Sequence, residues 1–220
     1  MKKIEIPSNL TTLAYNNIRE YILQGRLDET SRLTEDFLSG QLGISKSPVR
    51  EALNRLEAEG LIRIEPRKGA YLRRLTPLEI NEIYETREAL EAHVVRTAAI
   101  TPALLAELRQ SLRRQRTLLK ANDKPRYIGE DVRFHSLLAQ ATGNGYLCAL
   151  LANIQNQIWL ARRRTYDLSS STAPDFHDAI VGALEEHTRD AAERAMRDHI
   201  RTVRERLLQF MQAPPAAAGQ

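Results

Sequence analysis

Four side chains in the second half of the chain are of types that bind divalent metals. Asp131 and His135 are four residues apart, so both project from one face of a predicted helix. His199 falls on the apolar side of its own segment and is expected to point inward. Three imidazoles and one carboxylate suit zinc, nickel or manganese, and the candidate set is Asp131, His135, His177 and His199. Plainer interpretations stay open, since an Asp–His pair at this spacing is commonly a surface hydrogen bond and one inward histidine is commonly a core residue.

A second group of polar side chains, in the first third of the chain, could read DNA. A predicted helix from Ser45 or Lys46 to Gly60 buries one apolar stripe, formed by Val49, Ala52, Leu53 and Leu56. The stripe leaves Ser45, Lys46, Ser47 and Arg50 exposed near the start of the helix, where a recognition helix meets bases and phosphates. An arginine can pair with guanine through two hydrogen bonds, and serines suit phosphate contacts.

The elements around this helix predict a winged helix-turn-helix over residues 1–75. Apolar spacing favours a helix over 9–24, and Thr34 is a candidate N-cap for a short helix that ends near Ser39. Gly43 permits the sharp turn between the second and third helices, which are expected to pack through Phe37, Leu38, Leu42 and Ile44. Residues 61–65 and 70–73 read as a hairpin with a basic tip formed by Arg67, Lys68 and Gly69. An amphipathic helical hairpin with a solvated polar face is the plainer alternative.

Residues 76–212 predict a bundle of about six helices, so the fold class is mainly α. Thr76-Pro77-Leu78-Glu79 has a capping threonine, a proline in the first turn and a glutamate three residues after the cap. Thr101-Pro102 and Lys124-Pro125 start further helices, and longer segments follow over 146–166, 174–186 and 189–211. The tail 213–220 lacks apolar periodicity and is expected to be disordered.

The charge is concentrated where DNA binding is predicted. The chain has 220 residues and a net charge of +4, of which residues 1–75 contribute +3 from 13 Lys and Arg and 10 Asp and Glu. A single cysteine, Cys148, excludes an internal disulfide, and no apolar run is long enough to span a membrane. We therefore expect a cytoplasmic protein without a membrane segment.

Several motifs together resemble the GntR family of bacterial regulators. They are Leu33-Thr34-Glu35, the run from Leu42 to Leu53, the run from Leu56 to Ile62, and Pro66-Arg67-Lys68-Gly69. The resemblance implies that the chain binds operator DNA, with a contact set of Arg32, Thr34, Ser45, Lys46, Ser47, Arg50, Arg67, Lys68 and Gly69. Lys46 departs from the arginine that the family often has there, which weakens bidentate base reading at that position.

The helical part resembles the ligand-binding domain of the FadR subfamily, in its FCD version. Its marks are the segments 84–91 and 131–135, Gly143-Asn144, His177 and His199. The resemblance implies that Asp131 and the three histidines hold a metal whose open positions help to bind a small carboxylate or sugar acid. Arg87 is the candidate carboxylate anchor, although an ion pair with Glu91 explains it nearly as well, and Asn153 is a candidate polar wall. The run 162–164 reads as a solvated helix end, of which one arginine could face the cavity.

Three functions are compatible with this set of residues. A ligand-responsive regulator, expected to be a repressor, accounts for both the predicted DNA-binding domain, 1–75, and the helical domain, 76–212. It is expected to be a homodimer, because two-fold symmetric operators multiply specificity. A metal sensor would use the same cluster with the ion as the signal. A metalloenzyme could activate water at such a centre, but it leaves the DNA-reading head unexplained.

Overall fold

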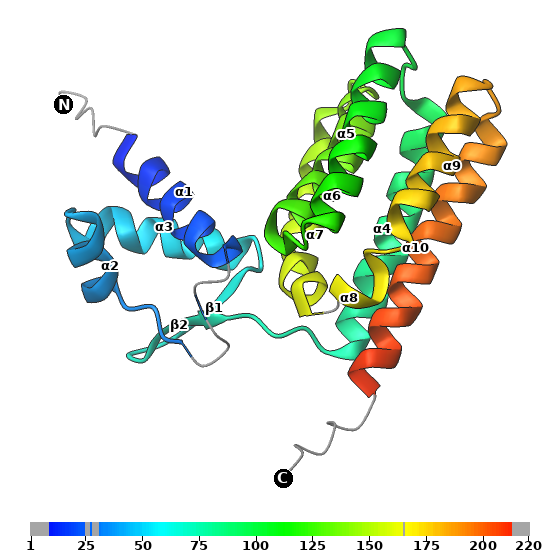
Figure 1. The fold of residues 1–220 in the computed structure, drawn as a ribbon. Helices are drawn as coiled ribbons and strands as arrows, with labels where there is room; N and C mark the ends of the chain where they lie inside the picture. The colour runs from blue at the N-terminus through cyan, green and yellow to red at the C-terminus, as the bar shows by residue number, and fades with distance from the viewer. Residues whose placement is uncertain (1–8, 25–26, 28–30, 165, 213–220) are drawn as a thin grey trace. The chain divides into compact units, whose positions relative to one another are not determined.

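The structure is a computed structural model that describes residues 9–24, 27, 31–164 and 166–212 (Figure 1). The tail expected to be disordered, 213–220, lies outside these residues. The chain divides into two compact units, Met1–Arg74 and Leu75–Gln220. The mainly α fold class is confirmed. No helix in the described part of the chain is long and apolar enough to cross a membrane.

The first unit consists of three helices followed by a two-stranded hairpin. Helix α1 spans Asn9–Leu23, α2 spans Glu35–Leu42 and α3 spans Lys46–Ala58, while β1, Ile62–Glu65, pairs with β2, Gly69–Leu72. The strands are antiparallel, with Ile62 opposite Leu72. Figure 1 shows α1 lying across α3, and the predicted stripe of α3 is buried against it. The winged helix-turn-helix arrangement predicted from the spacing is therefore present.

Two details of this unit differ from the sequence-based expectation. Helix α2 continues through Gly40 and ends at Leu42, because the residue that adopts the left-handed conformation and caps the helix is Gly43, with φ of 64°. Phe37 was expected between α2 and α3, but its side chain is 45% exposed and only Leu38 of α2 is buried. Periodicity over so short a helix did not decide which of two adjacent apolar residues points inward.

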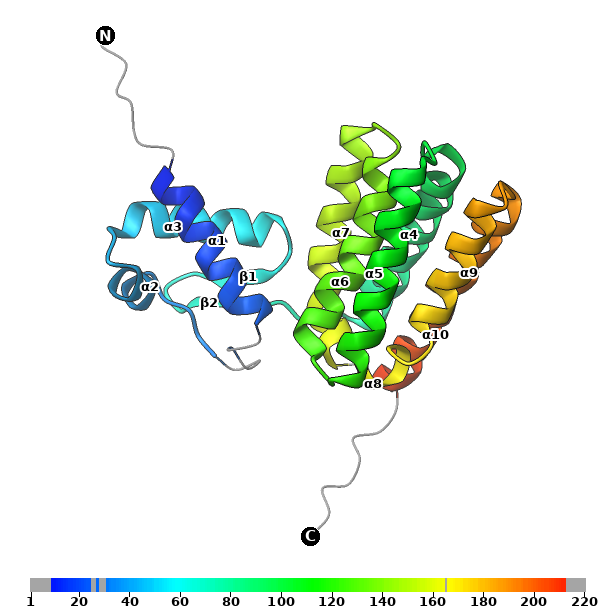
Figure 2. The ribbon, with the colours of Figure 1, turned by 45° about the horizontal axis from the view of Figure 1, so that its top comes forward.

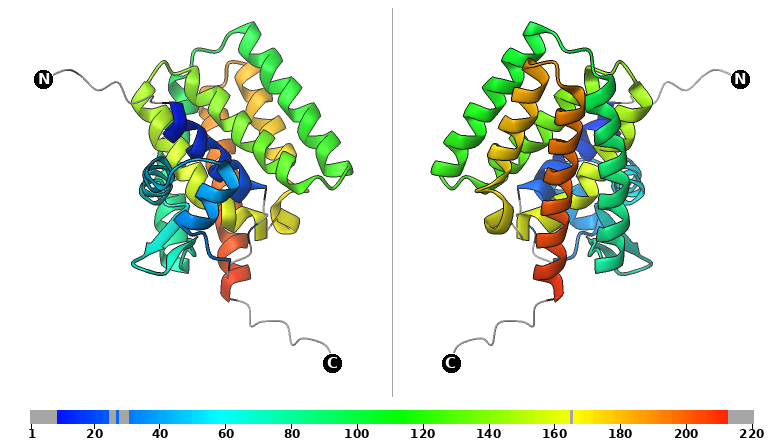
Figure 3. Two further views of the ribbon diagram at one scale, coloured as in Figure 1. Left: turned by 90° about the vertical axis from the view of Figure 1, so that its left-hand side faces the viewer. Right: turned by 90° about the vertical axis from the view of Figure 1, so that its right-hand side faces the viewer.

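The second unit is a helical bundle. Its long helices are α4, Pro77–Thr97; α5, Pro102–Lys120; α6, Lys124–Gln140; α7, Gly145–Arg164; α9, Ala173–Glu185; and α10, Arg189–Gln212. A single-turn helix, α8, covers Tyr166–Ser169. Thr76 and Glu79 form the predicted capping box at the start of α4. Figure 2 shows α5, α6 and α7 side by side, and the right panel of Figure 3 shows α10 running along α4 and α9.

The core of the bundle positions the polar cluster described next. Apolar residues from α4, α6, α9 and α10 face one another, including Tyr84, Phe134, Ile180 and Met196, none of them measurably exposed. Inside this apolar shell, a polar group must find a partner or bear the cost of burial. The buried charged residues of this core therefore mark the candidate functional site.

Candidate functional site

The four predicted metal ligands meet in the centre of the bundle. Asp131 and His135 come from α6, His177 from α9 and His199 from α10, and each is at most 2% exposed. One ligand atom from each residue lies within 4.8 Å of the others. The Nε2 atom of His177 is 3.2 Å from Nε2 of His199 and 3.7 Å from Oδ1 of Asp131. Three nitrogens and one carboxylate oxygen converging in this way can hold a divalent ion.

Two further buried residues orient two of the three imidazoles, those of His177 and His135. The Nδ1 atom of His177 lies 2.9 Å from Oε1 of Gln115, and Nδ1 of His135 contacts Oε2 of Glu91. Because both oxygens accept hydrogen bonds, the proton of each neutral ring belongs on Nδ1. The lone pair on Nε2 of His177 then faces His199 and Asp131, as metal ligation requires, while the lone pair on Nε2 of His135 lies within hydrogen-bond distance of the Arg87 guanidinium. Neither Gln115 nor the contact between Glu91 and His135 was anticipated from the sequence.

The protonation states also fit metal binding. Burial lowers the pKa of His177 to about 4, and burial lowers the pKa values of His135 and His199 well below the ordinary histidine value. Burial opposes ionisation of Asp131, but the guanidiniums of Arg162 and Arg87 hold the pKa of its carboxyl below its usual value. The cluster thus presents three neutral imidazoles and one carboxylate near pH 7, so metal binding releases no protons from them.

Two arginines are buried beside the cluster. Arg87 has no measurable exposure; its Nε–H donates to Oε1 of Glu91 over 2.6 Å, and its Nη2 lies 3.0 Å from Nε2 of His135. The predicted ion pair with Glu91 therefore exists, but it lies in the core and not on the helix surface. The Nη1 atom of Arg87 is buried without a hydrogen-bond partner among the described residues. That unused donor is available to an anion.

Arg162 corrects the interpretation of 162–164 as a solvated helix end. Its side chain is 10% exposed, its Nη2–H donates to Oδ2 of Asp131, and its Nη1–H donates to Oε1 of Gln155 over 3.3 Å. The side chains of Arg163 and Arg164 lie outside the described residues. The arginine turns inward because the buried Asp131 carboxylate attracts it, a contact across 31 positions that the local sequence pattern does not reveal.

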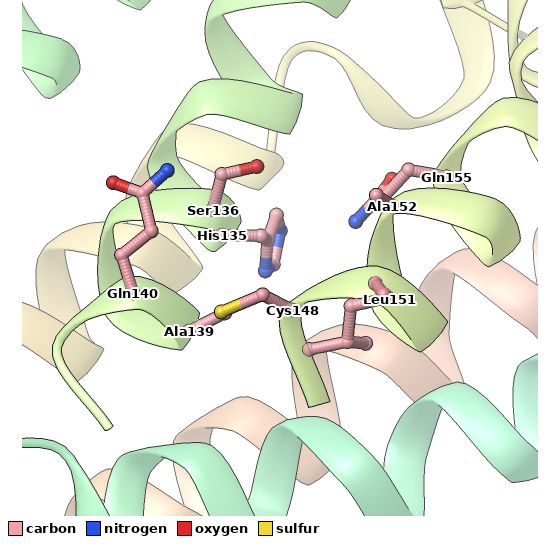
Figure 4. A pocket seen from close by; sticks show the side chains of 9 residues that line it. His135, Ser136, Ala139, Gln140, Cys148, Leu151, Ala152 and Gln155 are labelled. Carbon is pink, nitrogen blue, oxygen red and sulfur yellow. The ribbon is translucent and has the colours of Figure 1, made fainter. Parts of the chain in front are cut away.

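A cavity of about 300 Å³ between α6 and α7 reaches this cluster through His135 (Figure 4). His135 on α6 and Gln155 on α7 face it from its two walls, and Cys148 also lines it from α7. The Nε2 atom of Gln155 is buried without a partner within the described part of the chain. The predicted polar wall Asn153 does not line the cavity, and its Oδ1 accepts a 2.5 Å hydrogen bond from Gln157.

In the first unit, the predicted base- and phosphate-contacting residues lie together at the exposed start of α3. Ser45 occupies the N-cap position and makes no side-chain capping hydrogen bond, while Lys46, Ser47 and Arg50 are exposed. Two acidic residues of α2 contact this group, Glu35 with Arg50 and Asp36 with Lys46. These contacts were not predicted.

The remaining predicted DNA contacts lie at or beside the hairpin. Arg67 and Lys68 are exposed at its tip, where Arg67 has φ of 64°. The segment before α2 joins the hairpin, because Leu33 exchanges backbone hydrogen bonds of 2.8 Å with Ala70. Gly69 sits against this segment, and a Cβ added there would lie within 3.4 Å of side-chain atoms of Arg32 and Thr34. The Thr34 hydroxyl caps α2, accepting from the Phe37 N–H over 3.1 Å.

Comparisons with known proteins cover both units. Residues 10–72 match the family model described as bacterial regulatory proteins, gntR family, and residues 82–202 match the FCD domain. The HTH-type transcriptional repressor RspR of Escherichia coli is 29% identical over 204 residues, covering 90% of this chain and 89% of that protein. The gluconate operon transcriptional repressor of Bacillus subtilis is 32% identical over 141 residues, or 63% and 57% of the two chains. The solved structure of E. coli McbR/YncC has the same fold, with a TM-score of 0.81 at 22% identity over 92% of this chain and 98% of that one.

Proposed function

Because this chain belongs to the GntR family of bacterial regulatory proteins and carries an FCD domain, we propose that it is a homodimeric repressor controlled by a small organic acid. Family membership makes it a transcriptional regulator and not an enzyme, which removes the metalloenzyme alternative. The proposal adds the operator contacts, the metal, the class of effector and the dimer. A regulator of this kind acts on the chromosome, so we place it in the cytoplasm.

The observation that carries DNA recognition is the division of α3 into two faces. Its apolar stripe is buried against α1, while Ser45, Lys46, Ser47 and Arg50 are exposed at its first turns. A helix placed in this way can enter the major groove, and the hairpin tip with Arg67 and Lys68 can contact the backbone. One such helix reads only a few base pairs, so two copies on a two-fold operator supply the specificity.

The charge balance around the buried cluster supports an anionic effector. The carboxylates of Glu91 and Asp131 are matched by the guanidiniums of Arg87 and Arg162. A divalent ion held by Asp131, His135, His177 and His199 adds two positive charges that the described residues do not balance. Such an ion supplies a Lewis-acidic position for a carboxylate oxygen of the effector. Arg87, with its unpaired Nη1, is placed to bind a second oxygen.

The class of effector is therefore a small carboxylate or a sugar acid. The similarity to a repressor named for the gluconate operon supports the sugar-acid alternative. Effector binding would change operator affinity only through a difference in its affinity for the DNA-binding and released states. Burial of all four ligands favours a retained metal cofactor over an exchanging metal signal, which is the second candidate function.

The proposal is tested by a thermal-shift screen of carboxylates and sugar acids, run with and without chelator. We expect one chemical series to raise the melting temperature, and chelator to abolish the rise. Metal that survives dialysis supports a cofactor, whereas metal that exchanges and itself alters DNA affinity supports sensing. DNA reading is tested separately by electrophoretic retardation of the promoter of its own gene, where unchanged sequence-specific binding by Arg50→Ala would overturn the assignment of α3.

A further inference from the structure

Arg50, the side chain proposed to read a base, is held by a carboxylate of the preceding helix. Its Nε–H donates to Oε1 of Glu35 over 2.7 Å, and its Nη2–H donates to Oε2 of Glu35 over 2.7 Å. Two parallel hydrogen bonds between planar groups fix the plane of the guanidinium as well as its position. Glu35 is the first residue of α2, whose N-terminus is capped by Thr34, so the carboxylate projects from an ordered helical turn.

This ion pair occupies only one edge of the guanidinium. Of the five N–H groups of Arg50, Glu35 accepts two, from Nε and from Nη2. Three N–H groups remain, the two of Nη1 and the second one of Nη2. One N–H of Nη1 and the remaining N–H of Nη2 point in parallel from the edge of the guanidinium that lies farthest from the chain, its outer edge. That edge is the one that matches O6 and N7 of guanine. The Arg50 side chain is 61% exposed, and no partner of Nη1 is present among the described residues, so the edge is accessible.

The neighbouring pair, Lys46 with Asp36, has a different character. One contact of 2.5 Å joins Nζ of Lys46 to Oδ1 of Asp36, and the two side chains are 54% and 77% exposed. An ammonium group on a flexible stem has no plane to fix, and an exposed single contact contributes little. Lys46 can therefore leave Asp36 for a phosphate. Glu35 and Asp36 are adjacent in the chain, but only Glu35 makes two hydrogen bonds to its partner. Replacing Asp36 is therefore a matched control for the loss of negative charge at Glu35.

We propose that Glu35 is a positioning residue for sequence reading, which holds Arg50 so that its outer edge meets a guanine in the operator. This inference rests on the proposed role of α3 in DNA binding. Glu35 also carries a negative charge beside the recognition helix, where it opposes the attraction to phosphate for every sequence. It therefore lowers affinity for DNA in general while it raises the preference for one base pair. A carboxylate that merely stabilised α2 would not produce this combination.

The experiment compares Glu35→Gln with Asp36→Asn, each of which removes one negative charge from the same turn. The probes are a duplex enriched from a random-sequence library by the wild-type protein, a scrambled duplex of equal length, and a panel with single base-pair changes. Dissociation constants are measured by fluorescence anisotropy at two salt concentrations. Melting temperatures of both variants confirm that the first unit remains folded.

We expect both variants to bind the scrambled duplex more tightly at low salt. Only Glu35→Gln should lose preference for the enriched duplex, by about tenfold if one bidentate base contact is lost. That loss should fall on the same base pair that Arg50→Ala affects, and the double variant should lose no more than Arg50→Ala alone. The proposal is overturned if Glu35→Gln keeps its preference, or if Asp36→Asn loses it equally. Wild-type preference in Arg50→Ala would instead refute the assignment of α3 on which this inference rests.

Discussion

Replacement of Asp131 by asparagine should show whether the buried cluster is a metal site or a polar network that binds no metal. A ligand present at a hundred times its dissociation constant stabilises the folded state by about 2.7 kcal/mol. For a domain of this size, each kcal/mol corresponds to about 3 °C, so zinc, nickel or manganese should raise the melting temperature of the wild-type protein by about 8 °C. Asp131→Asn removes the only carboxylate of the four-ligand set, and the shift should nearly vanish. Differential scanning fluorimetry with chelator, followed by each metal in turn, measures both values.

The same variant has a second, metal-independent effect that can be measured in chelator. Asp131 is fully buried and contacts Arg162, so its loss leaves a buried guanidinium without its carboxylate, at a cost of about 3 kcal/mol. The matched control is Glu88→Gln, which removes a carboxylate bound by Arg197 and Arg201 away from the cluster. The control should keep the full metal shift. A wild-type protein that none of the three metals stabilises would refute the metal site, and an undiminished shift in Asp131→Asn would place the metal elsewhere.

Three further predictions concern DNA binding, the hairpin and pH. Lys46→Ala should reduce the slope of log Kd against log salt by about 1. Arg50→Ala should change sequence preference with a smaller change in that slope, because the Glu35 carboxylate already neutralises Arg50. Equal changes in slope for the two variants would contradict this prediction. Gly69→Ala should lower the free energy of unfolding of the first unit by about 2 kcal/mol, since Gly69 has φ of 110° and its added Cβ would lie 2.7 Å from a backbone oxygen. The Cβ added by Gly40→Ala would meet nothing within 4 Å, so this variant should instead stabilise α2 by about 0.5 kcal/mol. Urea denaturation measures both free-energy changes. In metal-free protein the pKa of His177 is about 4 when folded and 6.5 when unfolded, so the unfolded state binds the proton first and stability falls as pH drops from 6.5 towards 4. This residue alone should cost about 2 kcal/mol at pH 5 relative to pH 7, and a flat stability profile in chelator would contradict it.

The local signals in the sequence predicted most of the fold. Thr34 and Thr76 cap helices because short side chains can satisfy free backbone N–H groups nearby, and proline after Thr76 suits the first turn. These effects act within four residues, so they are visible in the chain itself. Where two local signals competed, as with Gly40 and Gly43, only the left-handed backbone of Gly43 showed which glycine ends α2.

The buried polar cluster was predicted only in part, because several of its contacts join residues that are far apart in the chain. Asp131 and His135 were paired by helical spacing, whereas His177 and His199 joined them through the resemblance to FCD domains. Among the residues that orient and balance this set, the pair of Arg87 with Glu91 was predicted and an inward arginine in 162–164 was left open, whereas Gln115 and the partner of Arg162 were missed. Gln115 lies 62 positions from the histidine it contacts, and Arg162 lies 31 positions from Asp131. Only the packing of α5 and α7 against their neighbours brings them there, and no periodicity within one helix encodes it.

Helix α4 has a mechanical consequence beyond the residues that it contributes to the cluster. It starts at Pro77, five residues after the end of β2 at Leu72, and Arg87 lies ten residues further on, about 15 Å along the axis. The helix contains no glycine, and its only proline is at the first position, so it has no built-in point of bending. A stiff rod of this length passes an axial displacement of its middle to its end with little attenuation. If the proposed acid binds beside Arg87, strain created there would reach residues 73–76, the segment that joins α4 to the hairpin, through the stiffness of this one helix.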